Sequence, residues 1–391
     1  MAYDFDREVS RRNTNSLKWD IKDNELPMWV ADMDFMTAQE IIDAVSEKAG
    51  HGIYGYSVVP ESWYAAYMDW WKRRHHLQME RDWLIFCSGV IPAISSIVRK
   101  LTTVGEKILI QTPVYNNFFN AVENNGRQVL ENPLQYKQGQ YEIDFDDLEQ
   151  KLSDPQTSMM ILCNPHNPVG RLWDRETLAL IGALCHRHHV IVVSDEIHCD
   201  LTEPGTEYIP FAAASDICRE NSVTCLAPTK AFNLAGLMTA AVMVPDSLLR
   251  HRVRCGLHTD EAAEPNFFAT AAAEAAFMKG EAWLDELRAY LSESRKFAAE
   301  FLNENLPQVT VVPAEATYLL WLDCRAITED SVKLADFIRR NTGLYVLAGS
   351  YYGMPGEGFL RVNIACPRRV VKDGVERLVR GVLLYTDNQK T

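Results

Sequence analysis

The chain is short of positive charge. Its 39 lysines and arginines stand against 53 aspartates and glutamates, so the formal charge at pH 7 is −14. The basic residues are scattered rather than gathered in a stripe, whereas proteins that hold nucleic acid or anionic membranes carry a basic patch. We therefore expect neither nucleic acid nor a membrane as a partner.

A long apolar run is also lacking, since no segment approaches the roughly 20 apolar residues of a membrane-spanning helix. The start of the chain, Met1–Glu8, is polar and acidic, unlike a secretory signal. The nine cysteines are odd in number and spread mostly through apolar runs, which is typical of reduced core thiols. These features predict a cytoplasmic protein.

From Trp83 onward, short apolar runs alternate with helical segments. Apolar, β-branched runs separated by helices favour a largely parallel sheet covered on both faces. The sequence therefore predicts an α/β fold with a mostly parallel sheet of seven strands. The expected strands are 84–87, 107–112, 127–130, 159–163, 190–194, 223–226 and 239–244.

A smaller α+β domain is expected after this sheet. A long alanine-rich helix is predicted to begin near residue 264 and to lead on to residue 302. Shorter strands at 309–312, 318–323 and 358–364 and a helix at 331–341 follow it. We divide the chain into an N-terminal arm and helix packing with the small domain (1–45), a large domain (46–280) and a C-terminal small domain (281–391).

Ligands of parallel α/β sheets sit beyond the carboxyl ends of the strands. The first candidate there is Gly89, which follows an expected strand and precedes a helix. The free amides of Val90 and Ile91 would bind a phosphate with help from the helix dipole. An ordinary strand–helix turn is the alternative.

Two further strand ends carry an amide and a carboxylate. Asn167 lies in the rigid loop Asn164–Gly170, from which it would donate to a phenolic oxygen; a plain turn is the alternative. Asp195 ends an apolar strand, where a carboxylate is costly unless a cation meets it, although it could instead cap a loop. His198 would reach the same phenolic oxygen of a bound ring or would support Asp195. Alternatively, it is simply a polar neighbour.

Lys230 lies between two expected strands, where burial would lower its pKa and favour a nucleophilic amine, whereas a lysine on an exposed helix is usually a solvated charge. Thr229 beside it would donate to a phosphate. Farther on, Arg361 would bind a substrate carboxylate through a bidentate pair. An amide, a carboxylate and a lysine in this order are what pyridoxal 5'-phosphate requires, since the carboxylate keeps the pyridine nitrogen protonated.

The chain resembles the fold-type I pyridoxal-phosphate enzymes of the aspartate aminotransferase superfamily over nearly its whole length. Within them it is most similar to the MalY/PatB group of cystathionine β-lyases, or cysteine-S-conjugate β-lyases. The segments that carry this narrower likeness are Trp29–Phe35, Tyr54–Tyr56, Thr112–Tyr115, Asp195–His198, Lys230–Asn233 and Phe359–Pro367.

The resemblance implies further roles and a pyridoxal-phosphate transferase-like large domain. Tyr115 would stack on the pyridine ring, joining Lys230 and Asp195 as a catalytic residue, although an aromatic side chain there also fits a core position. Tyr56 would cross a homodimer interface to the partner's cofactor phosphate and substrate. Val30, Ala31 and Asp32 would line the substrate site.

Two positions depart from the family pattern. Ala227 stands where many relatives have serine, and Met238 stands where many aminotransferases have arginine. Both changes remove phosphate contacts, so cofactor affinity would lean on Thr229, Tyr56 and the Val90–Ile91 amides. The cluster His186–His189 ends a helix, where basic residues complement the dipole, so we expect no metal.

The resemblance implies elimination of a thiol from a sulfur amino acid such as cystathionine, and with it a role in amino-acid metabolism, including methionine biosynthesis. Lys230 would take the α-proton, and the products would be pyruvate, ammonia and a thiol. Transamination by the same residues is the alternative. His198 stands where aminotransferases commonly have tyrosine, which favours the lyase. A non-catalytic binding protein of the same fold is a third hypothesis.

Overall fold

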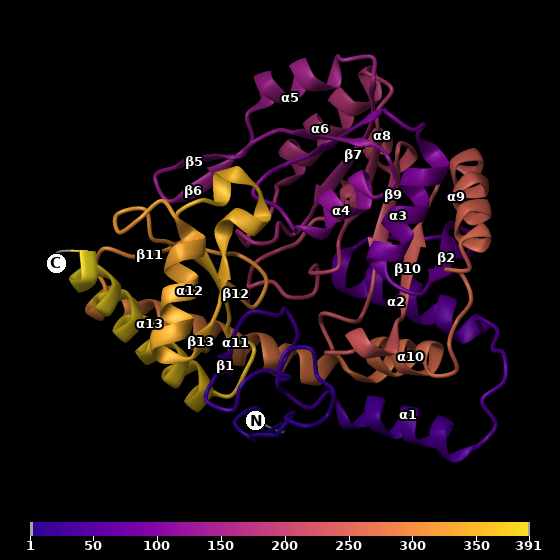
Figure 1. Ribbon diagram of the computed structural model, residues 1–391. Coiled ribbons are helices and arrows are strands. Elements are labelled where there is room, and N and C mark those ends of the chain that lie inside the picture. The colour runs from indigo at the N-terminus through magenta and orange to yellow at the C-terminus, as the bar shows by residue number, and fades with distance from the viewer. Residues whose placement is uncertain (1–2, 390–391) are drawn as a thin grey trace.

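Seven strands form the large sheet, in the spatial order β2, β10, β9, β8, β7, β3 and β4 (Figure 1). The computed structural model describes residues 3–389. The strands are β2 (Leu84–Cys87), β3 (Lys107–Ile110), β4 (Gln128–Glu131), β7 (Thr157–Cys163), β8 (Ile191–Asp195), β9 (Ser222–Leu226) and β10 (Ala240–Met243). Strand β10 is antiparallel to both neighbours and every other adjacent pair is parallel. The predicted α/β fold and all seven expected strands are confirmed.

Both faces of this sheet are covered because successive side chains of a strand point to opposite faces. Met159 and Ile161 pack in one apolar cluster, with α3 (Val90–Leu101), α4 (Asn117–Glu123) and α9 (Ser247–Thr259). Met160 and Leu162 pack in another, with α5 (Phe145–Leu152) and α6 (Arg175–Arg187). The short helices α7 (Phe211–Ala214) and α8 (Asp216–Glu220) lie beside α6. Two buried faces explain why these strands read as continuous apolar runs.

The smaller sheet has the order β11, β12, β15, β14 and is antiparallel throughout. Its strands are β11 (Thr310–Val311), β12 (Leu319–Asp323), β14 (Leu347–Ala348) and β15 (Phe359–Asn363). Its apolar cluster includes residues of α11 (Glu281–Asn305), α12 (Ser331–Thr342) and α13 (Arg368–Gln389). A hairpin of β5 (Gln135–Lys137) and β6 (Gln140–Glu142) stands apart from both sheets.

The expected continuous helix from residue 264 is wrong. Two helices occupy this stretch, α10 (Ala269–Lys279) and α11, and Gly280 separates them. A Cβ at Gly280 would lie 2.6 Å from the Ala276 carbonyl oxygen and from the Phe232 ring. Strong helix formers continue on both sides of Gly280, so local propensity does not reveal the break. None of the helices between residues 3 and 389 is long and apolar enough to cross a membrane.

The N-terminal arm contacts both parts of the molecule. Strand β1 (Leu26–Pro27) pairs in parallel with β13 (Leu344–Tyr345), which follows α12. Helix α1 (Gln39–Gly50) instead packs against α10, which packs against α2 (Glu61–His75), all three at the lower right of Figure 1. We expected the arm and its helix to pack with the small domain, but α10 lies in the segment that we assigned to the large domain. The division into 1–45, 46–280 and 281–391 stays a proposal.

The close backbone approach beside β15 gives a test of stability. A Cβ at Gly349 would lie 2.0 Å from the Gly356 carbonyl oxygen and 2.8 Å from that of Phe359. Gly349→Ala should therefore destabilise the protein by about 1–3 kcal/mol, as overpacking does. The matched control is Gly50→Ala, whose Cβ would meet nothing within 4 Å. Urea unfolding midpoints measure both variants, and equal midpoints would contradict the steric argument.

Candidate active site

Lys230 lies in the turn after β9, where it contacts the N-terminal arm. Its Nζ donates a hydrogen bond to the Ala31 carbonyl at 2.5 Å. Burial lowers the pKa of Lys230 to about 8, and Arg361 acts in the same direction, while Asp32 and Asp195 oppose them. An amine that titrates near neutral pH can act as a nucleophile and as a base.

Asp195 is buried at the carboxyl end of β8. One of its oxygens accepts the Ile197 amide at 3.1 Å. Burial raises the pKa of Asp195 to about 6, although the Ile197 amide and Lys230 lower it. A carboxylate held this way needs a cation to offset its lost hydration, so the position fits a protonated ring nitrogen.

Four predicted residues carry buried polar atoms that have no hydrogen-bond partner among residues 3–389. These atoms are Asn167 Oδ1, His198 Nδ1, Arg361 Nε and Asp32 Oδ1, the last of which lies 3.5 Å from Lys18 Nζ. Buried polar groups are nearly always paired, so their gathering around one site indicates a polar ligand. Burial, with Lys230 and Arg361, lowers the pKa of His198 to about 3, and the imidazole is therefore neutral.

Arg361 lies on β15 in the small sheet and reaches toward the large one. Its Nη2 donates to the Trp29 carbonyl at 2.7 Å, and its guanidinium lies 4.9 Å from the centre of the Tyr352 ring. Tyr115 accepts a hydrogen bond from Asn117 at 2.6 Å. Burial raises the pKa of Tyr115, Asn117 and Arg361 lower it, and Asp195 raises it further, so Tyr115 lies close enough to feel both charges.

The protein groups that could bind a phosphate lie at the same edge of the sheet, because the strands β2, β9, β8 and β7 all run in the same direction. Helix α3 begins at Val90, and Gly89 precedes it. The Val90 and Ile91 amides lie in the first turn, where no helical carbonyl is available to them. Thr229 is buried next to Lys230.

The positions that depart from the family pattern supply no polar group to this edge. Ala227 is buried, and Met238 is 53% exposed at the end of the 3-10 helix Ala235–Leu237.

The segment Trp29–Asp32, here called the strap, brings Val30, Ala31 and Asp32 to the site through its backbone. The Ala31 carbonyl accepts a second hydrogen bond, from the Tyr318 hydroxyl at 3.0 Å. The Asp32 side chain is turned to Arg11, at 2.6 Å.

Sequence reasoning missed the role of two strap contacts, Tyr318 and Asn363. The position of Asn363 two residues after Arg361 was a usable signal, since residues i and i+2 of a strand share a face.

Comparison with known proteins identifies the family of this chain. The sequence pattern of the family described as "Aminotransferase class I and II" matches residues 26–378. The chain belongs to this family.

Two curated relatives are similar over nearly the whole chain. The cystathionine β-lyase PatB of Bacillus subtilis (strain 168) is 42% identical over 381 residues, 96% of this chain and 98% of PatB. Protein MalY of Escherichia coli (strain K12) is 31% identical over 388 residues, 97% and 99% of the two chains. The likeness to the MalY/PatB group is thus confirmed.

Two solved structures have the same fold. Cystalysin from Treponema denticola, which contains a pyridoxal 5'-phosphate cofactor, superimposes with a TM-score of 0.95 at 31% identity, covering 98% of this chain and 99% of cystalysin. The pyridoxal-phosphate-bound C-S lyase of Staphylococcus hominis gives 0.92 at 33% identity, covering 97% and 99%.

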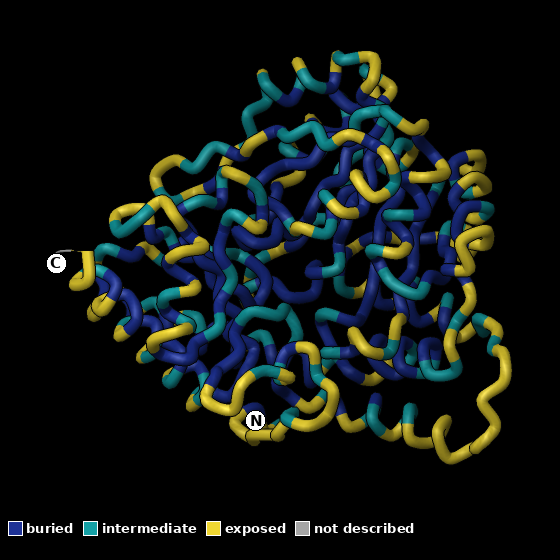
Figure 2. The backbone as a smooth tube through the Cα atoms, viewed as in Figure 1, coloured by how far each residue is buried: buried dark blue, intermediate teal, exposed yellow. Residues whose placement is uncertain are grey.

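Tyr56 is the one predicted residue that this aminotransferase-family chain does not bring to its own site. Tyr56 is fully exposed in the extended segment between α1 and α2, where Ile53, Tyr54 and Val58 are also largely exposed. This segment is the long exposed stretch at the lower right of Figure 2.

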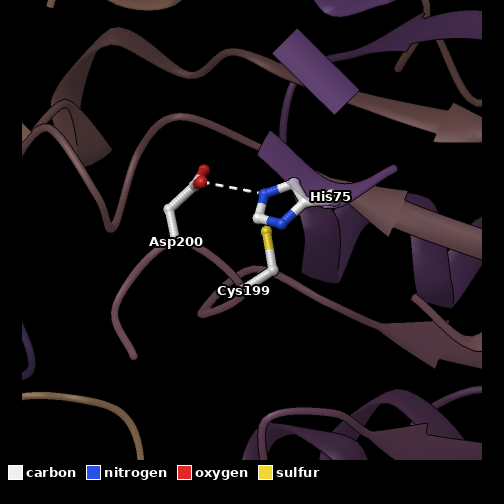
Figure 3. A group of neighbouring side chains, drawn as sticks. All are labelled: His75, Cys199 and Asp200. Atoms are coloured by element: carbon white, nitrogen blue, oxygen red, sulfur yellow. Dashed lines mark hydrogen bonds and ion pairs between the residues drawn. The ribbon is translucent and has the colours of Figure 1, made fainter. Parts of the chain in front are cut away.

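The structure also contains a buried group that we did not anticipate, made of His75, Cys199 and Asp200 (Figure 3). Their ligand atoms lie within 4.8 Å of one another. The Asp200 carboxylate, however, already accepts His75 Nε2 at 2.9 Å and Trp70 Nε1 at 3.1 Å. Burial alone would raise the pKa of Asp200, but His75 and its other partners lower it. We interpret the group as a hydrogen-bonded anchor between α2 and the segment after β8.

The raised pKa of Asp195 predicts that this residue destabilises the protein when no cofactor is bound. The folded pKa is about 6 against an ordinary value of 3.8, so stability falls as pH rises through this window. Cofactor-free Asp195→Asn, which keeps the Oδ1 acceptor, should be more stable than the wild type by about 3 kcal/mol at pH 7. The difference should vanish below about pH 4.

Urea unfolding of both proteins across pH 4–8 measures this effect. A variant equally stable at pH 7, or a gain that persists unchanged at pH 4, would contradict it.

Proposed function

We propose that the protein is a pyridoxal-phosphate-dependent carbon–sulfur β-lyase. It cleaves L-cystathionine or related cysteine-type amino acids to pyruvate, ammonia and a thiol. The observation that carries this proposal is the assembly of Lys230, Asp195, Asn167 and Arg361 at one edge of the sheet, in a chain 42% identical to a cystathionine β-lyase.

The residues present fit the cofactor. When bound, pyridoxal phosphate supplies an aldehyde for amines and a ring that withdraws electrons from the substrate α-carbon. Asp195 would hold the ring nitrogen, Tyr115 the ring face, and Asn167 with His198 the phenolic oxygen. The groups that would hold the phosphate are Gly89, Val90, Ile91, Thr229 and the partner's copy of Tyr56.

The protein's own side chains then divide the reaction between them. Arg361 binds the substrate carboxylate, with its buried Nε free to donate. Lys230 Nζ takes the α-proton, because its pKa of about 8 leaves part of the amine unprotonated at neutral pH. Loss of this proton allows the thiolate to leave from the β-carbon. His198 is neutral and therefore adds no positive charge that would compete with Arg361 for the substrate carboxylate.

Transamination is the second candidate, favoured by the family to which the chain belongs. Both reactions begin with the same proton transfer to Lys230. They differ in the next step. A transaminase returns the proton to the cofactor side, whereas a lyase releases a thiol. Products therefore separate the two reactions.

Incubation of the pyridoxal-phosphate-loaded protein with L-cystathionine should release pyruvate and thiol in equal amounts when no 2-oxo acid acceptor has been added. Lys230→Ala should lower kcat/KM by roughly a thousandfold, as loss of a principal catalytic group does. The exposed Lys279→Ala is the control and should retain activity. Turnover that requires a 2-oxo acid would establish transamination, and unchanged turnover in Lys230→Ala would point to a non-catalytic role for this site.

We further propose a homodimer with shared active sites. Ile53, Tyr54, Tyr56 and Val58 are all large, apolar or aromatic, and exposed, and contiguous exposed patches of this kind mark interaction surfaces. A second copy of the chain would bring Tyr56 to the site that its own chain leaves without it. The cysteine pattern and the lyase relatives support a cytoplasmic location and a role in methionine biosynthesis.

Mixing two inactive variants tests the shared site. In a hybrid of Lys230→Ala and Tyr56→Ala subunits, one site regains both wild-type residues if Tyr56 acts across the interface. With equal amounts of the two variants, random reassortment of subunits should then restore about one quarter of wild-type activity, averaged over all sites in the mixture. Each variant alone serves as the control. A mixture no more active than its parts would show that Tyr56 serves its own chain or is not needed.

A further inference from the structure

Every backbone carbonyl of the strap accepts a hydrogen bond from a side chain. Arg361 bonds the Trp29 carbonyl at 2.7 Å, and Lys230 bonds that of Ala31 at 2.5 Å. The remaining two carbonyls, of Val30 and Asp32, both accept hydrogen bonds from the Asn363 side-chain amide, and that of Asp32 also accepts one from Lys18 Nζ at 3.3 Å.

Asn363 is fully committed to this contact. Its Nδ2 donates to the Val30 carbonyl at 2.6 Å and to the Asp32 carbonyl at 2.7 Å. Its Oδ1 accepts the Ala365 amide at 2.8 Å. The side chain is 1% exposed, so water does not compete for these bonds. A buried amide with all its bonds satisfied has one favoured orientation, and it fixes the two carbonyls that it bridges.

The carbonyl between those two is the acceptor for Lys230. Asn363 thus holds the strap on both sides of Ala31. The large-domain side fixes the adjoining segment in a similar way, because Asn233 donates to the Met33 and Phe35 carbonyls at 3.0 Å. A carbonyl dipole held in place stabilises a protonated amine without having to reorganise.

We propose that Asn363 is a positioning residue that fixes the Ala31 carbonyl as the acceptor for the protonated Lys230 amine. The carbonyl then receives Nζ–H when the amine carries the proton taken from the substrate. The catalytic meaning of this contact rests on the proposed function, whereas the contact itself does not.

The same strand also couples the strap to substrate binding. Arg361 and Asn363 lie two residues apart on β15, and both bond the strap. A substrate carboxylate that draws Arg361 away from the Trp29 carbonyl leaves Asn363 as the remaining anchor of the strap to β15 on this face. Asn363, together with the Tyr318 hydroxyl that bonds the Ala31 carbonyl directly, would keep this carbonyl in place during that exchange.

The pKa of Lys230 in the full-length protein, freed of pyridoxal phosphate, tests the proposal directly. Trace labelling with acetic anhydride across pH 6–11, read by mass spectrometry at Lys230, gives its midpoint, with exposed Lys279 as internal reference. Asn363→Ala should lower this midpoint by about one pH unit, because an Ala31 carbonyl that is no longer held in place is a poorer acceptor for the charged amine. Asn363→Ser keeps one donor and should give an intermediate value, and it carries the test if the alanine variant does not fold.

The matched control is Asn132→Ala. Asn132 is also a buried asparagine whose Nδ2 bonds two oxygens, of Asp144 and Asp147, but it follows the edge strand β4. A midpoint lowered at Asn363 and not at Asn132 supports the proposal. An unchanged midpoint in a folded Asn363 variant, or an equal change in the Asn132 variant, overturns it.

Activity supplies a separate readout. In the loaded protein, Asn363→Ala should lower kcat at least tenfold while KM changes less, because Arg361 is intact and Lys230 is misplaced. An unchanged kcat, with the whole loss of kcat/KM caused by a higher KM, would overturn the positioning role. A wild-type protein without lyase activity would refute the proposed function, and the labelling result would still decide the role of Asn363.

Discussion

Two hydrogen bonds from charged side chains to the strap, Lys230 to the Ala31 carbonyl and Arg361 to the Trp29 carbonyl, join the large sheet to the small one. The lysine follows β9 and the arginine lies on β15, so neither sheet alone places them together. The separation between Lys230 and Arg361 therefore depends on how the backbone of residues 29–31 is held. Asn363 holds this backbone from the small sheet, and Asn233 holds the adjoining residues Met33 and Phe35 from the large-domain side.

The chemistry of the site comes from burial that opposes folding. Burial lowers the pKa of Lys230, raises that of Asp195 and keeps His198 neutral. Each displaced pKa is a group held in its less stable environment, which is the usual conflict between a functional site and stability. A bound cofactor with a protonated ring nitrogen would relieve the burial cost of Asp195 and add to the stability of the loaded protein.

The buried anchor of His75 and Asp200 keeps a second carboxylate apart from the site. It lies in the segment that directly follows Asp195–His198 and ties this segment to α2. Because Asp200 is satisfied by His75 and Trp70, it does not compete with Asp195 for a cation. Two carboxylates five residues apart thus have separate hydrogen-bond partners.

The amino-acid sequence alone is enough to predict the seven strands and the order of chemical groups at their ends. Apolar runs record burial on two faces, and parallel strands place their carboxyl ends at one edge, so Asn167, Asp195 and Lys230 can be placed together from the sequence pattern. The residue types also reveal which groups need a charged partner.

How distant segments meet is a property of the tertiary structure. The alanine-rich stretch divides at Gly280, α1 packs against α10 rather than the small domain, and Tyr318 and Asn363 lie against the strap. The spacing of Arg361 and Asn363 indicates that they share a face of β15, but it does not reveal that their partners are backbone carbonyls of the strap. Every residue has one, so no side-chain pattern records which carbonyl a distant donor will find.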